Sequence, residues 1–198
     1  LFGEAASTID SIDINQTAAS SSSVSGNITD TNNSESTCIG GLIGRISHST
    51  NAPRTWNISN VTLSGEIKAT EARHTKRIGG LIAEIANYTY DYTSTSPSFA
   101  NRDLTLDGII LDGLSVQGTA GHYTNDGGVS PLSSGGLLGY DWLNTNVILK
   151  NVTTQNGAKV KLTSESGYGD FAGLVYNATG YWKVGTLTLT ELNAEADN

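Results

Sequence analysis

The chain has few of the residues that support long helices, disulfides or nucleic-acid binding. Charged residues make up only 15% of its 198 positions, and Cys38 is its one cysteine, so no disulfide can form within the chain. Scarce Glu, Lys and Arg disfavour long surface helices. A net charge of −8 disfavours a nucleic-acid partner, because phosphate binding requires clustered Lys and Arg. No run approaches the roughly 20 apolar residues that span a bilayer, so we expect no membrane insertion of this segment.

Gly, Ser, Thr and Asn fill the chain instead, and a short glycine phrase recurs in it. The phrase reads CIGGLIGRI from Cys38, IGGLIAEI from Ile78, SGGLLGYDW from Ser134 and FAGLVYNA from Phe171. The first five residues of the chain, LFGEA, resemble the second half of this phrase. Its leucine stands at Leu1, Leu42, Leu81, Leu137 and Leu174. The period is roughly 40 residues with one longer interval, which indicates a repeat architecture. Because the first residues lie inside a repeat, we expect a segment of a longer repeat protein.

Each glycine phrase is followed by apolar residues at positions i, i+3 and i+5, and then by a weaker strand pattern around Ile67, Val116 and Val160. The triplets are Ile9, Ile12 and Ile14; Ile58, Val61 and Leu63; Leu106, Ile109 and Leu111; Leu149, Val152 and Thr154; and Leu189, Leu192 and Ala194. No segment holds the periodicity of an amphipathic helix, and the four comparable strands of a propeller blade are not evident.

These repeats predict an all-β fold, a right-handed parallel β-helix (β-solenoid) of about four to five coils that forms one segment over residues 1–198. Equivalent residues of successive coils would stack about 4.8 Å apart. Two columns of small residues would then mark a sharp corner, followed by an inward column of the four internal leucines. The small columns are Gly40, Gly79, Gly135 and Ala172, and Gly41, Gly80, Gly136 and Gly173.

The phrases GGLIG, ISNVTLSG and GEI resemble the GLUG-motif repeats of large secreted and surface-anchored proteins, many of them bacterial adhesin-like chains. The resemblance covers most of the chain, through one partial and four recognisable copies. In the last copy Ala172 replaces the first glycine and Tyr176 the last. The resemblance implies a solenoid and an extracellular or cell-surface location, and it implies no particular activity.

The outward positions of the triplets do not gather acids in adjacent coils, which a glycoside-hydrolysing pair of carboxylates would need. The two outward columns read Asp10, Ser59, Asp107, Lys150 and Thr190, and Ser11, Asn60, Gly108, Asn151 and Glu191. Asp107 and Lys150 are expected to form a surface ion pair. His48, His74 and His122 lack the spacing of metal ligands, and TNDGG at Thr124–Gly128 is expected to be a turn. We therefore predict no enzyme activity, no catalytic residue, no metal and no cofactor.

Three smaller features receive structural predictions. The only basic cluster, RHTKR at Arg73–Arg77, is predicted to be a solvated loop. Cys38 is predicted to be a small packing residue rather than a nucleophile. Tryptophans lie between the glycine phrase and the triplet in three repeats, at Trp56, Trp142 and Trp182, and are predicted to have a structural role at corners.

Two inserts lengthen one repeat, Asn87–Asp103 and Gly118–Gly135. Loops that leave a rigid scaffold often carry recognition, and tyrosine is a good contact residue. The candidate ligand contacts are Tyr88, Tyr90, Tyr92 and Tyr123. The inserts leave the same repeat and could meet on one face, where a neutral glycan or a host or neighbouring surface protein would bind. The alternative is that they only pack on the side of the solenoid.

Eight Asn-x-Ser/Thr sequons occur, at Asn15, Asn27, Asn32, Asn57, Asn60, Asn87, Asn151 and Asn177. They indicate either a glycosylated surface protein or a chance product of a composition rich in Asn, Ser and Thr. If the source glycosylates, Asn60 and Asn151 are the expected acceptors, because they share one outward column.

The leading hypothesis is a non-enzymatic extracellular structural or adhesive module, a stalk or adhesin repeat region. One alternative is a subunit of a self-assembling surface filament that associates through its end coils. The other is a carbohydrate-active enzyme on the same fold.

Overall fold

The structure of the chain is a computed structural model. The residues that it describes are 2–5, 11–15, 22–24, 26–30, 37–47, 54–72, 76–86, 102–120, 132–141, 145–164, 170–175, 182–184, 187–189 and 193–197. Within these ranges the secondary structure is β-strand joined by turns, and no helix occurs.

The strands form five parallel sheets, which we name A to E in the order in which the chain enters them. Sheet A holds β1 (Phe2–Ala5), β6 (Ile43–Ser47), β11 (Ile82–Ala86) and β16 (Leu138–Asp141). Sheet B holds β2 (Ser11–Asn15), β7 (Arg54–Ser59), β12 (Arg102–Asp107), β17 (Asn146–Lys150) and β21 (Trp182–Val184). Sheet C holds β3 (Ser22–Val24), β8 (Val61–Leu63), β13 (Ile110–Asp112), β18 (Val152–Gln155) and β22 (Leu187–Leu189). Sheet D holds β4 (Asn27–Asp30), β9 (Glu66–Ala72), β14 (Ser115–Ala120), β19 (Lys159–Ser164) and β23 (Asn193–Asp197). Sheet E holds β5 (Thr37–Gly40), β10 (Lys76–Gly79), β15 (Leu132–Gly135) and β20 (Asp170–Ala172).

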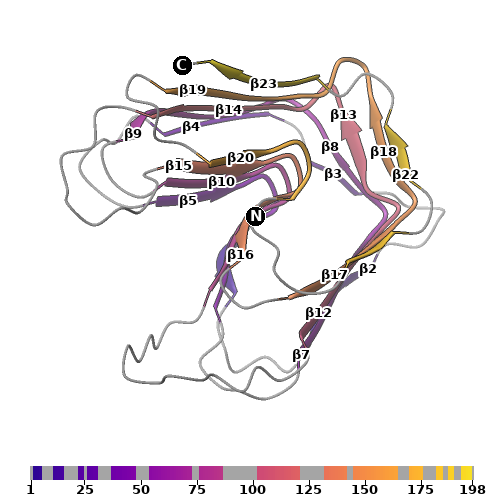
Figure 1. The fold of residues 1–198 in the computed structure, drawn as a ribbon. Coiled ribbons are helices and arrows are strands. Elements are labelled where there is room, and N and C mark those ends of the chain that lie inside the picture. Colours follow the sequence, from indigo (N-terminus) through magenta and orange to yellow (C-terminus); the bar gives the residue numbers. More distant parts are fainter. Residues whose placement is uncertain are drawn as a thin grey trace, which may run out of the picture.

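Consecutive strands of the chain enter successive sheets, so each circuit of the five sheets is one coil of a parallel β-solenoid. Coil 1 holds β1–β4, coil 2 β5–β9, coil 3 β10–β14, coil 4 β15–β19 and coil 5 β20–β23. Figure 1 shows the coils stacked behind one another, with sheet E folded back between sheets D and A. The predicted parallel solenoid is confirmed.

The paired glycines form the corner between sheets E and A, and a different steric contact excludes a side chain at each of the two positions. A Cβ on Gly79 would lie 1.7 Å from the carbonyl oxygen of Ile82 in the same coil, so the first glycine allows the turn itself. A Cβ on Gly80 would lie 1.9 Å from the carbonyl oxygen of Gly136 in the next coil, so the second glycine allows the coils to stack. The pairing of Gly79 with Gly40 and Gly135 confirms the predicted columns.

The core consists of inward columns of apolar side chains that run through the coils. In β12 buried and half-buried residues alternate, which is the period of a strand with one face in a core. The leucine column follows the glycine corner: the amides of Leu42 and Leu81 donate to the carbonyls of Leu81 and Leu137 at 3.0 and 3.1 Å. All three leucines are buried. Burial of each such side chain contributes about 1.5–3 kcal/mol, so the columns supply most of the stability.

The three middle triplets stack as predicted, whereas the first and the last were assigned wrongly. Ile14 pairs with Ile58, and Val24 pairs with Leu63, so coil 1 does not use Ile9 and Ile12 in this role. In that coil β2 ends at Asn15 and β3 begins at Ser22, so the corner is longer and the spacing is lost. In coil 1 the residue that pairs with Ser59 of the first outward column is Asn15, and Ser11 pairs with Thr55 instead; Asp10 lies outside the described residues.

In coil 5 the spacing i, i+3, i+5 occurs twice in succession, and the earlier set is the structural one. Val184 pairs with Leu149, and Leu187 and Leu189 pair with Val152 and Thr154. Ala194 pairs with Val160, one sheet further along. Thr190 and Glu191 of the predicted outward columns lie outside the described residues. The sequence pattern alone could not distinguish the two sets.

The inserts are shorter than predicted, because strands extend into them. Arg102 and Asp103 belong to β12, and the second insert loses Gly118–Ala120 to β14 and Leu132–Gly135 to β15. Residues 87–101 therefore connect sheet A to sheet B, and residues 121–131 connect sheet D to sheet E.

The corner between sheets B and C requires a left-handed backbone in three successive coils. Asn60, Gly108 and Asn151 have φ values of 55°, 66° and 50°, and these residues share one column, as predicted. Glycine and asparagine are the residues that adopt this conformation at least cost. This explains why the column contains no β-branched residue.

We expect Gly108→Ala to lower the free energy of unfolding by about 1–2 kcal/mol, because an alanine at φ 66° is strained. Gly108→Asn places an equally large Cβ at the same distance from the Asn60 side-chain oxygen, 2.7 Å, but tolerates the backbone. Urea denaturation of both variants should therefore show a smaller loss for the asparagine variant. Equal losses would mean that crowding against Asn60, rather than backbone strain, sets the cost.

Candidate functional site

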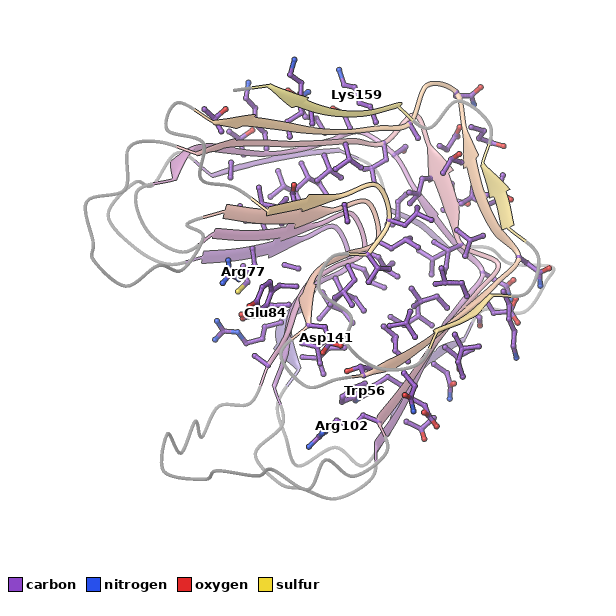
Figure 2. The ribbon with its side chains drawn as sticks, viewed as in Figure 1. Trp56, Arg77, Glu84, Arg102, Asp141 and Lys159 are labelled. Carbon is purple, nitrogen blue, oxygen red and sulfur yellow. The ribbon has the colours of Figure 1, made fainter. Side chains whose placement is uncertain are left out.

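The angle between sheets E and A holds a cluster of polar side chains that the triplet pattern does not explain. Cys38 and Arg77 pair in sheet E, and Arg45, Glu84 and Tyr140 stack in sheet A. We call these five residues the notch cluster. Figure 2 shows Arg77 and Glu84 facing each other across this angle, on the side away from the main core. The cluster thus joins coils 2, 3 and 4 where the glycine corner brings their two sheets close together.

The cluster is centred on the Glu84 carboxylate. The Arg45 Nε donates to Glu84 Oε2 at 2.6 Å, and the Cys38 thiol donates to the same oxygen at 3.1 Å. Arg45 Nη2 also donates to Cys38 Sγ at 3.3 Å. Arg77 Nε lies 3.9 Å from Glu84 Oε1, and its guanidinium carbon lies 4.1 Å from the centroid of the Tyr140 ring. One carboxylate therefore lies between two guanidinium groups, and one of these also makes a cation–π contact.

Burial decides how these charges behave. The side chains of Arg77 and Glu84 are 2% and 6% exposed, whereas that of Arg45 is 35% exposed. A buried charge is tolerated only when it is paired and hydrogen-bonded, which Glu84 achieves through Arg45 and Cys38. The prediction of a solvated loop at RHTKR is wrong for Lys76 and Arg77, which belong to β10, whereas residues 73–75 lie outside the described residues.

The surroundings of the Cys38 thiol disfavour its reactive, deprotonated form. Burial, and then the negative charge of Glu84, raise the pKa of Cys38 to about 12. Because the thiolate is the reactive form, a thiol with so high a pKa should react more slowly than an ordinary cysteine. Cys38 is half-buried and lies in a polar cluster, so its packing partners are the charged groups rather than the apolar core.

We expect Cys38 to react slowly with iodoacetamide at pH 8 in the folded chain and at the ordinary rate of a free thiol in urea. The folded pKa of about 12 exceeds the usual 9.0, so the folded form retains a proton that the unfolded form loses. This contribution to stability is complete below pH 9 and disappears as the pH rises through the folded value. Urea titrations at pH 8 and pH 11 should show the loss, and Cys38→Ala should reduce it. Equal alkylation rates with and without urea would contradict the prediction.

A second set of polar contacts lies on the outer face of sheets B and C. Three carboxylates of coil 3 accept hydrogen bonds from amides of coil 4: Asp103 from Asn146, Asp107 from Asn151, and Asp112 from Gln155 and Asn156. Lys150 pairs with Asp107 in the ladder, but these two described side chains do not form the predicted ion pair. The Asp107 carboxylate instead accepts a hydrogen bond from Asn151 Nδ2 at 2.8 Å. The neighbours of Asp107 in its column are Ser59 and Lys150, so no second carboxylate stacks on it.

The predicted site residues fall into two groups. Tyr88, Tyr90, Tyr92 and Tyr123 lie outside the described residues, as do the three histidines. Asn60 and Asn151 are described, and Asn60 is half-buried whereas Asn151 is exposed. Asn60 and Asn151 occupy the left-handed corner together with Gly108.

The tryptophan prediction is wrong at Trp56. This residue is 2% exposed in the middle of β7 and pairs with Ile12 and Leu104, so it fills a flat inward column rather than a corner. Trp182 pairs with Val147 in the same column of coil 5, and Trp142 lies outside the described residues.

Sequence reasoning missed the notch cluster and one buried carboxylate, Asp141. Asp141 pairs with Ile85 in an inward column, is 2% exposed, and accepts hydrogen bonds from the amide and hydroxyl of Thr145 at 2.8 and 3.0 Å. The sequence did contain a signal for the notch cluster. Each glycine phrase has a polar residue at position i+3 from its leucine: Arg45 after Leu42, Glu84 after Leu81 and Tyr140 after Leu137. A charged residue that recurs in that position should have indicated a polar column.

The comparisons with known proteins supply no relative. No protein-family model, no curated protein and no solved structure matches the chain. Within the described residues, no group of three or more His, Cys, Asp or Glu side chains is arranged to hold a metal ion. A search of the same residues for a helix long and apolar enough to cross a membrane found none.

Proposed function

We propose that the chain is a non-enzymatic extracellular structural or adhesive module, the stalk or adhesin repeat region of a surface protein. The observation that carries the proposal is the unbroken stacking of the coils, in which sheets B, C and D each hold five strands in one parallel order. Such a solenoid is stiff along its axis because successive coils are hydrogen-bonded to one another through parallel strands. Stiffness over a set length is what a stalk requires.

The side-chain contacts between coils support a structural role. Amide-to-carboxylate hydrogen bonds connect coils 3 and 4 on the outer face, and the notch cluster connects coils 2, 3 and 4 on the other side. A glycosidase needs two carboxylates held close together across the bond that it breaks. The outer carboxylates of coil 3 are instead each bonded to an amide, which favours a scaffold over the carbohydrate-active enzyme.

The strand topology favours the notch side as the recognition surface. Sheet E strands run towards the glycine corner and sheet A strands run away from it, so the outer ends of the two sheets form the two sides of the mouth of the angle (Figure 1). Residues 121–131 join the chain at the start of β15, and residues 87–101 join it at the end of β11. Both inserts are therefore attached at this mouth, and their tyrosines remain our proposed contacts for a neutral glycan or a surface protein.

The experiment separates adhesion, scaffolding and catalysis with one purified chain. Beads coated with the chain are tested on a glycan array and on surface proteins, and soluble chain is incubated with a panel of polysaccharides. A variant in which residues 88–100 are replaced by a short Gly-Ser linker is the control, because Ala86 and Arg102 at the strand ends are retained. Binding that the linker variant loses at unchanged thermal stability supports an adhesin. New reducing ends from any polysaccharide would reject the non-enzymatic proposal.

One observation favours the filament as a second candidate. Ile28 is 40% exposed although it pairs with Ile67, whose column is buried in coils 2 to 4. A further coil, contributed by a second copy, would cover Ile28 and extend sheet D. Light scattering should then show growth with concentration that Ile28→Lys abolishes. A monomer at every concentration would reject the filament.

A further inference from the structure

We propose that Asn151 carries an N-linked glycan, and that the neighbouring sequon asparagines Asn57 and Asn60 do not. The structure separates these three acceptors, which are equivalent as sequence motifs. Asn151 is exposed, whereas Asn57 and Asn60 are half-buried. The proposal rests on the proposed function in one respect: the chain must be exported, because it then passes the enzyme that attaches glycans.

The position of Asn151 suits a bulky substituent. Asn151 stands between β17 and β18 with φ 50°, at a corner where the chain leaves one sheet and enters the next. A group attached there projects from the edge of the coil instead of covering a strand face. The backbone hydrogen bonds of sheets B and C therefore stay intact when the side chain is modified.

The contact of the Asn151 side chain is compatible with modification. Its Nδ2 donates one hydrogen bond, at 2.8 Å, to Asp107 Oδ1. In the transfer, Nδ2 forms a bond to the anomeric C1 of a lipid-linked diphospho-oligosaccharide, the C1–O bond breaks, and the lipid diphosphate leaves as the amide loses one proton. The linked nitrogen keeps one hydrogen, and one hydrogen is enough for the hydrogen bond to Asp107.

The side chains of Asn60 and Asn57 do not have the same room for a glycan. The side-chain oxygen of Asn60 lies against the corner of coil 3, 2.7 Å from where a Cβ on Gly108 would be. Asn57 lies in the middle of β7, where the strands of coils 1 and 3 pair with it through Asp13 and Thr105. A glycan on Asn57 would have to leave from within the sheet, between two neighbouring strands about 4.8 Å away.

The corner also points away from the notch. Figure 1 places the junction of β17 and β18 on the opposite side of the coil from the outer ends of sheets E and A. A glycan on Asn151 would shield the side of the solenoid opposite the proposed recognition surface and leave that surface open.

The test uses two threonines that occupy equivalent positions, Thr62 and Thr153, which both pair with Ile110. Thr153→Ala removes the sequon of Asn151 and leaves Asn151 and its bond to Asp107 in place, and Thr62→Ala does the same for Asn60. Wild type and both variants are secreted from a eukaryotic host, and the glycopeptides are mapped by mass spectrometry before and after an endoglycosidase. We expect the peptide with Asn151 to carry one glycan that Thr153→Ala removes and Thr62→Ala retains, while the peptide with Asn57 and Asn60 is bare.

Each other outcome overturns the proposal. A bare Asn151 in wild-type chain, secreted beside a control glycoprotein that is modified, would show that the corner is not an acceptor. A glycan on Asn57 or Asn60 would show that half-burial in the folded coil does not decide occupancy. Circular dichroism of the secreted variants verifies that neither alanine changes the fold. Because occupancy is read directly from mass, the result does not depend on whether the chain proves to be a stalk, an adhesin or an enzyme.

Discussion

Gly80→Ala should force coils 3 and 4 apart at the glycine corner and should destabilise the chain more than any other substitution proposed for it. The new Cβ would lie 1.9 Å from the carbonyl oxygen of Gly136 and 2.7 Å from a methyl carbon of Leu114. The Leu114 side chain could rotate, but the carbonyl belongs to the backbone of the stacked corner. Gly80 also donates its own amide hydrogen to Gly135 at 3.1 Å, so the two backbones cannot separate without losing the ladder. We expect a loss above about 3 kcal/mol in the free energy of unfolding, at the upper end for overpacking.

Gly157→Ala is the matched control, because it adds the same methyl group at a corner with space. No atom lies within 4 Å of a Cβ on Gly157, although its φ of 73° is strained for alanine. The control should therefore lose only about 1–2 kcal/mol in urea denaturation followed by circular dichroism. A loss in Gly80→Ala no larger than that of the control would show that the close approach of the coils does not explain the second glycine column.

The solenoid was predictable from the sequence because its constraint repeats. The same steric requirement at the glycine corner recurs in coils 2, 3 and 4, so Gly40, Gly79 and Gly135 recur in register. The end coils were misassigned for a physical reason. The corner between sheets B and C tolerates extra residues, as between Asn15 and Ser22, so spacing alone does not fix the register there.

The candidate site was harder to predict than the fold. A charged residue on a strand is usually solvated, and although the glycines predicted a sharp corner, they do not show how close sheet E comes to sheet A. Only this folding buries Arg77 against Tyr140 and Glu84. The amide-to-carboxylate bonds were missed for a similar reason, because Asp107 and Asn151 are 44 positions apart and meet only through the stacking of the coils.

Glu84→Ala should be the second most damaging substitution, because it leaves the buried positive charge of Arg77 without the nearby carboxylate. The side chain of Arg77 is 2% exposed, so water cannot replace Glu84 without opening the corner. Removing one partner from a buried ion pair typically costs about 3–5 kcal/mol. Arg45 and Cys38 would lose their shared hydrogen-bond acceptor as well, since both bind Glu84 Oε2. Urea denaturation should show the loss, and alkylation of Cys38 should become faster in the folded chain.

The double variant Glu84→Ala with Arg77→Met tests whether the cost comes from the uncompensated charge. Methionine fills much of the volume of the arginine stem and can still contact the Tyr140 ring, whose centroid lies 4.1 Å from the present guanidinium carbon. If the charge is responsible, the double variant should be more stable than Glu84→Ala alone, and the coupling between the two sites should be about 1–3 kcal/mol. A double variant whose loss equals the sum of the single losses would mean that the two side chains act independently. Glu84 would then stabilise the corner through Arg45 and Cys38 rather than through Arg77.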